Sequence, residues 1–328
     1  MINLSKRSMK NSLNTVIGLT FVTLGLLSAC GSKPKSDEYT GTAAVAGHVY
    51  FAADESFAPI MDELVDVFNA QHPGDTVEAI YTNELDAINM LMENKVWVTV
   101  ATRDLNSKER QNLKERRYLP ITKRICYDGL ALICHRSNPD SIITVKNLKR
   151  ILSGEVKQWS ELYPGSKLGE IDVCFDSEKS AAVHFCVDSL LDGQPINSPN
   201  IAAVKSSPEV INYVEKTPGA IGIIGNNWLN DKRDTTNVTF KKEITVMGVS
   251  KMDSAARYNS YKPYQYNLAM GYYPLIRTIY VLVNDPMRAL PYRFSNFLTL
   301  PVGQLIIFKS SLLPVQGNME VRNVEIVQ

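Results

Sequence analysis

The stretch YFAADESFAPIMDELVDVF, residues 50–68, joins a buried strand to an amphipathic helix and sets the fold class. Apolar residues precede the polar junction at residues 54–56, and after it they recur at three- and four-residue spacing from Phe57 to Phe68. Pro59 falls in the first turn of the predicted helix, where a missing amide costs no hydrogen bond. The junction therefore lies at a helix N-terminus, where free backbone amides favour anions.

The N-terminus has the pattern of a secretory signal peptide. Three cationic residues at positions 6, 7 and 10 precede an apolar run over residues 16–27, which ends in Leu-Ser-Ala-Cys-Gly at 27–31. The run is shorter than the about 20 residues of a transmembrane helix. Its ending is similar to a bacterial lipobox, which predicts a lipoprotein signal peptide over residues 1–29. It also predicts acylation of Cys30 and a flexible tether over residues 30–45. An ordinary signal peptide with a chance cysteine is the alternative.

Charge and residue spacing argue against nucleic-acid binding and metal chemistry. Removing the three positive charges of the signal peptide takes the net charge from +1 to −2, so the mature chain lacks the strongly basic surface that nucleic acids require. The four histidines and the four cysteines that follow Cys30 lack metal-ligand or redox spacing. We therefore expect no metal, no cofactor and buried free thiols, while a disulfide between Cys174 and Cys186 stays open.

The remainder of the chain alternates short apolar strands with helical stretches, the pattern of α/β proteins. Its about 300 residues exceed what one hydrophobic core usually serves, which predicts two lobes. The predicted strands cover residues 48–52, 77–81, 96–101, 130–134, 171–175, 220–224 and 278–283. The predicted helices after the first cover residues 86–94, 107–117, 145–153, 180–191, 207–216 and 288–300. Ligands of open α/β sheets bind beyond the carboxyl ends of strands, so we expect the ligand in a cleft between the lobes.

Residues 128–162, DGLALICHRSNPDSIITVKNLKRILSGEVKQWSEL, resemble the Pst-type phosphate-binding proteins of bacterial phosphate ABC transporters. The shared order is Asp-Gly before an apolar strand, then Asn-Pro, Ser-Gly and Trp-Ser-Glu-Leu. Three further segments are similar to the family: TPGAIGII at 217–224, YYPLIRTIYVLV at 272–283 and FLTLPVGQLIIFKSSLLPV at 297–315. The chain resembles a divergent lipoprotein member of this family.

The resemblance implies a two-lobed α/β fold of the type II periplasmic-binding-protein class. Each lobe would be a mixed sheet flanked by helices, with the ligand cleft between the lobes. Lobe I would comprise residues 46–137 plus 273–328, and lobe II residues 138–272. The tyrosine-rich segment ARYNSYKPYQYNLAMGYYP, residues 256–274, is interpreted as packing near the hinge rather than as a ligand box.

The first two anion contacts of the family correspond to the starts of two predicted helices. The first is a hydroxyl and the next backbone amide, which correspond to Ser56 and Phe57, while Asp54 takes the N-cap role. The alternative is that Ser56 only caps the helix. At the second contact this chain has Glu84 and Asp86, which we interpret as capping residues because two carboxylates would repel a dianion.

The third and fourth anion contacts depart from the family pattern. Where the family has an aspartate that accepts a proton from phosphate, this chain has Thr102 and Arg103, and the arginine fork suits two oxygens of an oxyanion. The alternative is that Arg103 pairs with a neighbouring carboxylate, Asp104 or Glu109. Where the family reads R-x-x-x-S-G-T, only Ser180 survives, followed by the amides of Ala181 and Ala182. We hypothesise that Arg103 replaces the missing arginine from the opposite lobe. These predicted ligand residues are Ser56, Phe57, Thr102, Arg103, Ser180, Ala181 and Ala182.

The resemblance implies a lipid-anchored solute-binding protein of the cell envelope. It would bind phosphate or a similar small oxyanion as a monomer, pass it to an ABC permease in the inner membrane, and perform no chemistry. The alternatives are a binder of another anion, such as sulfate or a carboxylate, and a surface sensor or interaction lipoprotein with a degenerate cleft. A hydrolase using Ser180 and His184 is disfavoured because no G-x-S-x-G turn and no orienting acid accompany the pair.

Overall fold

The structure is a computed structural model that describes residues 47–230 and 240–316. The predicted signal peptide, the acylated Cys30 and the tether lie outside the described residues. Within these two ranges, no helix has both the length and the apolar character needed to cross a membrane.

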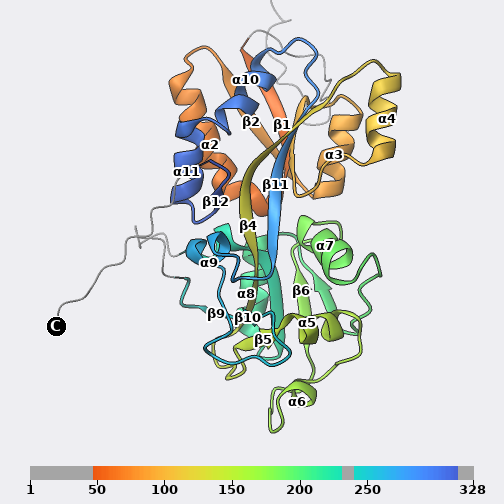
Figure 1. Ribbon diagram of the computed structural model, residues 1–328, viewed down its shortest axis with the longest axis vertical. Helices are drawn as coiled ribbons and strands as arrows, with labels where there is room; N and C mark the ends of the chain where they lie inside the picture. The colour runs from red at the N-terminus through yellow and green to blue at the C-terminus, as the bar shows by residue number, and fades with distance from the viewer. Residues whose placement is uncertain (1–46, 231–239, 317–328) are drawn as a thin grey trace, which may run out of the picture. The chain divides into compact units, whose positions relative to one another are not determined.

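Two lobes share one mixed sheet, as expected for the two-lobed α/β fold (Figure 1). The first lobe contains β1 (His48–Asp54), α2 (Ala58–Gln71), β2 (Thr76–Thr82), α3 (Glu84–Met92), β3 (Val98–Ala101), α4 (Ser107–Glu115), α10 (Leu290–Phe297), α11 (Pro301–Lys309) and β12 (Leu313–Pro314). The second contains β5 (Ile142–Thr144), α5 (Val145–Leu152), α6 (Trp159–Leu162), β6 (Asp172–Phe175), α7 (Ala181–Phe185), β7 (Ile201–Ala203), α8 (Ser207–Lys216), β8 (Ala220–Gly225), β9 (Ile244–Val246), β10 (Gly248–Ser250) and α9 (Gln265–Ala269).

Two long strands, β4 (Ile121–His135) and β11 (Ile276–Val283), connect the lobes. They pair antiparallel along the whole of β11, and the sheet order is β2-β1-β3-β11-β4-β8-β6-β7, with β9 and β12 also paired to β4. Figure 1 shows the two strands running side by side from one lobe into the other. In this pair of strands Arg277 on β11 lies directly opposite Asp128 on β4.

The strand β4 belongs to two hydrophobic cores. Ile125 and Cys126 pack with Phe51, Phe68 and Phe294 in the first lobe, whereas the following residues Leu130, Leu132 and Cys134 pack with Trp159 and Phe175 in the second. The part of β4 over residues 130–134 is buried throughout, and it reads as an apolar run rather than as an alternating one. The predicted lobe boundaries at residues 137/138 and 272/273 stay a prediction.

The opening stretch forms the strand and helix that its pattern predicts. The strand β1 ends at Asp54, a single 3₁₀ turn covers Glu55–Phe57, and α2 follows with Ile60, Leu64 and Phe68 buried. The Asp54 carboxylate accepts the Ser56 amide, so its predicted N-cap role is confirmed. The Asp54 cap and the apolar face of α2 both indicate the same boundary between the strand and the helix.

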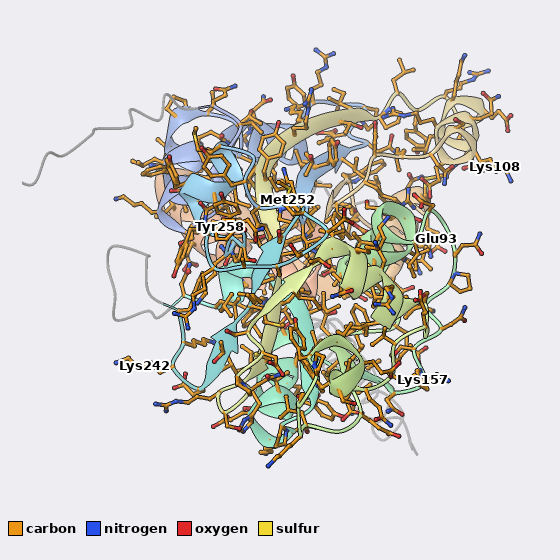
Figure 2. All side chains as sticks on the ribbon, turned by 60° about the horizontal axis from the view of Figure 1, so that its bottom comes forward. Glu93, Lys108, Lys157, Lys242, Met252 and Tyr258 are labelled. Carbon is orange, nitrogen blue, oxygen red and sulfur yellow. The ribbon has the colours of Figure 1, made fainter. Side chains whose placement is uncertain are left out.

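The tyrosine-rich segment divides between core and surface. Tyr273 is fully buried and its hydroxyl donates to the Leu130 carbonyl at 2.7 Å, whereas Tyr258 is 83% exposed and projects from the surface near Met252 (Figure 2). Cys126, Cys134, Cys174 and Cys186 are buried free thiols, so Cys174 and Cys186 form no disulfide.

Candidate anion-binding cleft

A buried ion pair joins the two connecting strands where the lobes meet. The Arg277 guanidinium on β11 donates from Nε to Asp128 Oδ2 on β4 at 2.9 Å, and Nη2 lies 2.8 Å from the same oxygen. The side chains are 1% and 0% exposed. The Gly225 backbone lies so close that an added Cβ would sit 2.8 Å from Arg277 Nη2. Glycine at position 225 is therefore required by the ion pair.

The Arg277 guanidinium retains hydrogen-bonding capacity beyond Asp128. Its Nη2 donates weakly to Ser56 Oγ at 3.4 Å, and its Nη1 has no hydrogen-bond partner among the described residues although it is buried. An unpartnered buried N–H on a cation is costly, so it is suited to a ligand or a water molecule. Arg277 is thus the buried cation best placed to hold an anion in this part of the chain.

Asp54 bridges the two lobes with its carboxylate. Oδ1 accepts the Ser56 amide of its own lobe and Oδ2 accepts the Ala181 amide of the second lobe, both at 3.0 Å. Asp54 is 1% exposed. Burial and the nearby charge of Glu84 raise the pKa of Asp54 above its usual value. The amide that starts α7 therefore already has an anionic partner from the chain itself.

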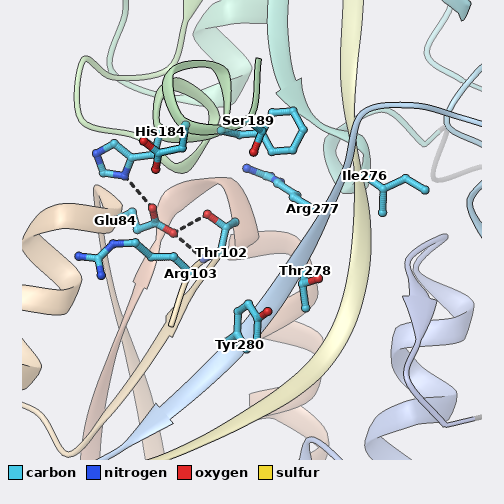
Figure 3. Close-up of a pocket in the computed structure, with 11 residues that line it drawn as sticks. Glu84, Thr102, Arg103, His184, Ser189, Ile276, Arg277, Thr278 and Tyr280 are labelled. Atoms are coloured by element: carbon cyan, nitrogen blue, oxygen red, sulfur yellow. Dashed lines mark hydrogen bonds and ion pairs between the residues drawn. The ribbon is translucent and has the colours of Figure 1, made fainter. Parts of the chain in front are cut away.

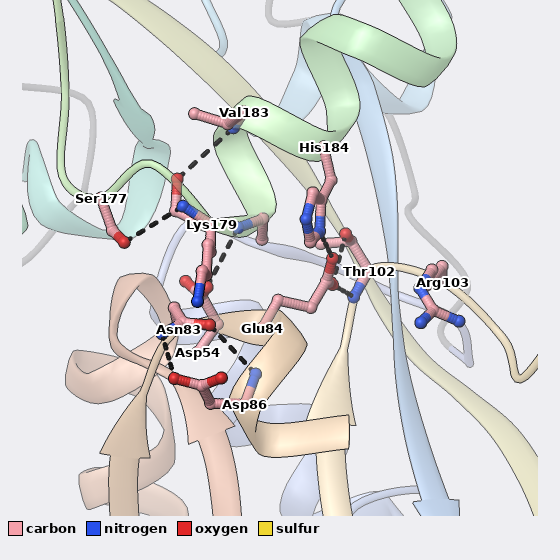
Figure 4. A network of polar contacts seen from close by, with 12 residues as sticks. Asp54, Asn83, Glu84, Asp86, Thr102, Arg103, Ser177, Lys179, Val183 and His184 are labelled. Carbon is pink, nitrogen blue, oxygen red and sulfur yellow. Dashed lines mark hydrogen bonds and ion pairs between the residues drawn. The ribbon is translucent and has the colours of Figure 1, made fainter. Parts of the chain in front are cut away.

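Glu84 forms a second bridge between the lobes. Its Oε1 accepts the Thr102 hydroxyl at 2.7 Å and the Thr102 amide, and its Oε2 lies 2.7 Å from His184 Nδ1 on α7 (Figure 4). Burial would raise the pKa of Glu84, but the hydrogen bonds from His184 and Thr102 lower it. The hydrogen bond to Glu84 raises the pKa of His184. This contact is a charge-assisted pair inside the cleft.

Further polar contacts between the lobes surround these two bridges. Glu55 Oε2 accepts the Ser207 amide at 3.1 Å and the Ser207 hydroxyl at 3.0 Å, at the start of α8. The Ser56 carbonyl accepts Asn227 Nδ2 at 2.9 Å and the Trp228 indole N–H at 3.0 Å. Most of these contacts between the lobes thus involve the three consecutive residues 54–56 of the first lobe.

One cavity of about 260 Å³, which we call the Arg277 cavity, opens between the lobes beside β11. Three basic side chains line it, Arg277, Arg103 and His184, together with two carboxylates, Glu84 and Asp188. Hydroxyls and apolar groups complete the lining, from Thr102, Ser189, Thr278, Phe185, Ile276 and Tyr280. In Figure 3 the Arg277 guanidinium extends from β11 toward the segment that carries His184 and Ser189.

A second cavity of about 350 Å³, the Asp176 cavity, has the opposite character. Its lining includes the carboxylates of Asp54, Glu55 and Asp176 and one amine, the exposed Lys205. Asp176 is 3% exposed and its Oδ1 has no hydrogen-bond partner among the described residues. Burial and the charge of Asp54 raise the pKa of Asp176 to about 7.

The structure places the predicted ligand residues around both cavities. Thr102 and Arg103 line the Arg277 cavity, and Ser180 lines the Asp176 cavity. Ser56, Phe57, Ala181 and Ala182 are buried. Asp54 links two of these predicted contact points, because it accepts the amides of Ser56 and Ala181. The roles of the seven residues as ligand contacts stay predictions.

The structure gives the partner of Arg103 and corrects one expectation about Glu84. Arg103 donates from both terminal nitrogens to Glu109 at 2.8 Å, the neighbouring carboxylate that the alternative interpretation named, and its role as a ligand contact stays a prediction. Glu84 is not a helix cap: Asn83 caps α3 by accepting the Asp86 amide, while Glu84 turns toward Thr102 and His184. Sequence distance explains this error, since His184 lies 100 residues away.

The pairing of Ser180 with His184 that a hydrolase would need is not formed. Ser180 Oγ accepts the Val183 amide at 3.4 Å, while His184 Nδ1 faces Glu84.

Arg277 was not predicted as a site residue, although the sequence contained a signal for it. An arginine inside the apolar strand LIRTIYVLV must either break that strand or be paired when buried.

The PBP superfamily domain matches residues 39–301, so the chain belongs to this superfamily. The phosphate-binding protein PstS of Pseudomonas aeruginosa is 21% identical over 320 residues, covering 92% of this chain and 94% of that protein. PstS of Borreliella burgdorferi is 23% identical over 278 residues, covering 82% and 90%.

Solved structures give the same fold. An ABC-type phosphate transport receptor from Vibrio cholerae superposes with a TM-score of 0.63 at 20% identity, covering 82% of this chain and all of the other. PstS from Borrelia burgdorferi gives a TM-score of 0.51 at 21% identity, with 83% and 100% covered. The two-lobed fold of the binding-protein class is therefore shared at low sequence identity.

Proposed function

We propose that this protein is a lipid-anchored solute-binding protein that captures a small oxyanion and passes it to an ABC permease in the inner membrane. Phosphate is the first candidate, because the two relatives named above are phosphate-binding proteins and the Vibrio cholerae structure is an ABC-type phosphate transport receptor. The protein acts as a monomer that binds its solute without chemical change.

One observation supports anion binding most directly: the buried Arg277 guanidinium borders a cavity between the lobes and keeps an unpartnered Nη1. Hydrogen bonds to a charged group contribute about 1.5–3 kcal/mol each, and they gain strength where water is excluded. Hydroxyls of Ser189 and Thr278 border the same cavity and offer further donors, whereas the Thr102 hydroxyl already donates to Glu84. An oxyanion seated there would satisfy the free nitrogen of Arg277.

Calorimetric titration of the mature protein with inorganic phosphate tests this function, with sulfate and short carboxylates as comparison ligands. We expect one site per chain and a rise in melting temperature, since ligand at a hundred times its dissociation constant stabilises by about 2.7 kcal/mol. Binding of sulfate or a carboxylate in preference to phosphate would keep the binding class and change the solute. Absence of binding for every anion would reject solute capture.

A second candidate function is a surface sensor or interaction lipoprotein whose cleft no longer binds a solute. The contacts of Asp54 with Ala181 and of Glu55 with Ser207 favour it, because the chain's own carboxylates occupy amides of the second lobe. A titration without binding, together with retained capture of a protein partner by the intact lipoprotein, is the result that this candidate requires.

The anchor is tested separately from the cleft. Replacing Cys30 by serine removes the thiol that would be acylated, so we expect the variant to leave the membrane fraction of cells while the parent protein stays there. An unchanged membrane fraction for the variant would exclude acylation of Cys30 as the means of attachment.

A further inference from the structure

We propose that the Asp54 carboxylate acts as an internal anion that competes with bound oxyanions for the Ser56 and Ala181 amides, and that Asp54 therefore determines which anions the cleft accepts. This inference rests on the proposed function, because it concerns the same cleft.

The geometry of Asp54 is that of a bound ligand. Its two oxygens accept amides from the two lobes, both at 3.0 Å, and the amides belong to residues 56 and 181 of the chain. The carboxylate is shielded from solvent, with Asp54 1% exposed. An oxyanion that used the Ser56 or the Ala181 amide would have to displace Asp54 from it, since a backbone amide donates one hydrogen.

One of the donors that Asp54 uses belongs to a residue that also contacts Arg277. The Ser56 amide donates to Asp54, and the Ser56 hydroxyl oxygen accepts a hydrogen bond from Arg277 Nη2 at 3.4 Å. Arg277 keeps Nη1 unpartnered within the described residues. The Arg277 guanidinium and the Ser56 and Ala181 amides therefore form one group of donors, of which the Asp54 carboxylate occupies two.

The charges around this group of donors disfavour a doubly charged ligand. Asp128 already pairs with Arg277, and Asp54 and Asp176 add two further buried carboxyl groups that are close enough to raise each other's cost of ionisation. A phosphate dianion would add two negative charges beside a single buried guanidinium. Removing the Asp54 charge should therefore favour dianions most.

Glu55 supplies a matched control one position along the chain. Its carboxylate also crosses to the second lobe, but it accepts the Ser207 amide and hydroxyl rather than the Ala181 amide. Asp54→Asn and Glu55→Gln each remove one negative charge from the same segment. Only Asp54→Asn frees one of the amides that Asp54 holds, because asparagine has a single acceptor oxygen and can accept either the Ser56 or the Ala181 amide but not both.

Calorimetric titration with inorganic phosphate at pH 7.5 compares the mature parent protein with both variants. We expect Asp54→Asn to bind phosphate at least about tenfold more tightly than the parent, and Glu55→Gln to stay within about threefold of it. Asp54→Ser is the second variant, since its hydroxyl can accept the Ser56 amide but is too short to reach Ala181. A thermal melt of each variant verifies folding.

The possible results distinguish failure of the inference about Asp54 from failure of the proposed function. A parent protein that binds phosphate, with Asp54→Asn and Asp54→Ser binding it no more tightly, overturns the inference and keeps the proposed function. An equal gain for Glu55→Gln also overturns it, because a general charge effect would then explain the result. If neither the parent nor any variant binds phosphate, sulfate or a carboxylate, both the inference and the proposed function fail.

Discussion

The Arg277 cavity and the Asp176 cavity are both lined by residues of the two lobes, yet they differ in how their charges are compensated. In the first, the Glu84 carboxylate has three hydrogen-bond donors, two from Thr102 and one from His184. In the second, Asp176 has a hydrogen bond with the Ser180 side chain, but its Oδ1 has no partner among the described residues. Burial therefore has opposite outcomes, because the pKa of Glu84 is lowered whereas that of Asp176 is raised to about 7. Donors, and not burial alone, decide whether a buried carboxylate is stable as an anion.

The largest effect should come from the buried cation beside the first cavity. Replacing Arg277 by methionine leaves Asp128 buried without its partner, which should lower the free energy of unfolding by about 3–5 kcal/mol and abolish anion binding. Urea denaturation measures the loss. Arg103→Met is the control, because its pair with Glu109 is partly exposed and should contribute about 1 kcal/mol or less. If both variants lost the same free energy of unfolding, the buried ion pair of Arg277 would contribute no more than the partly exposed pair of Arg103.

The next effect should come from the Asp176 carboxylate of the second cavity. An aspartate in an unfolded chain titrates near pH 3.9, so between about pH 4 and 7 the folded protein holds a proton at Asp176 that the unfolded chain releases. The parent protein should therefore lose stability relative to Asp176→Asn as the pH rises through this window.

We expect Asp176→Asn to be more stable than the parent by a few kcal/mol at pH 8 and to differ little at pH 4. Melting temperatures across this range measure the difference. Glu178→Gln changes an exposed carboxylate two residues away and controls for net charge. If Asp176→Asn were less stable than the parent at pH 8, the ionised Asp176 carboxylate would have to be stabilised by a further interaction.

A smaller effect should come from the ion pair of Glu84 with His184. The raised pKa of His184 means that its stabilising charge is fully present below about pH 6.5 and is lost as the pH rises through the folded value. His184→Gln should therefore be less stable than the parent by about 1–2 kcal/mol at pH 6, and the gap should narrow at pH 9. A gap that is constant with pH, measured by urea denaturation, would mean that the contact is not ionic.

The smallest effect should come from an uncharged contact between the lobes. Trp228→Phe removes one of two donors to the Ser56 carbonyl, while Asn227 remains. We expect a loss of about 0.5–1 kcal/mol, without pH dependence, in thermal melts at pH 6 and 8. A loss as large as that of Arg277→Met would show that neutral contacts, rather than charges, hold the lobes together.

Local pattern predicted the opening strand and helix, because cap, proline and apolar spacing all lie within residues 50–68. It did not predict that β4 extends to Ile121–His135, since a long strand is fixed by its partner β11, more than 140 residues later. The same distance hid the Arg277 pair with Asp128, which lies 149 residues away. The sequence predicted features whose residues lie close together along the chain. It did not predict the ion pairs of the cleft, because their partners are far apart in sequence.

A structure of the mature protein solved with saturating phosphate tests the central claim most directly. We expect an anion within hydrogen-bonding distance of Arg277 Nη1, between residues of both lobes and close to the Ser56 and Ala181 amides. An anion bound elsewhere, with Arg277 Nη1 still unpartnered, would contradict the assignment of this cleft as the solute site.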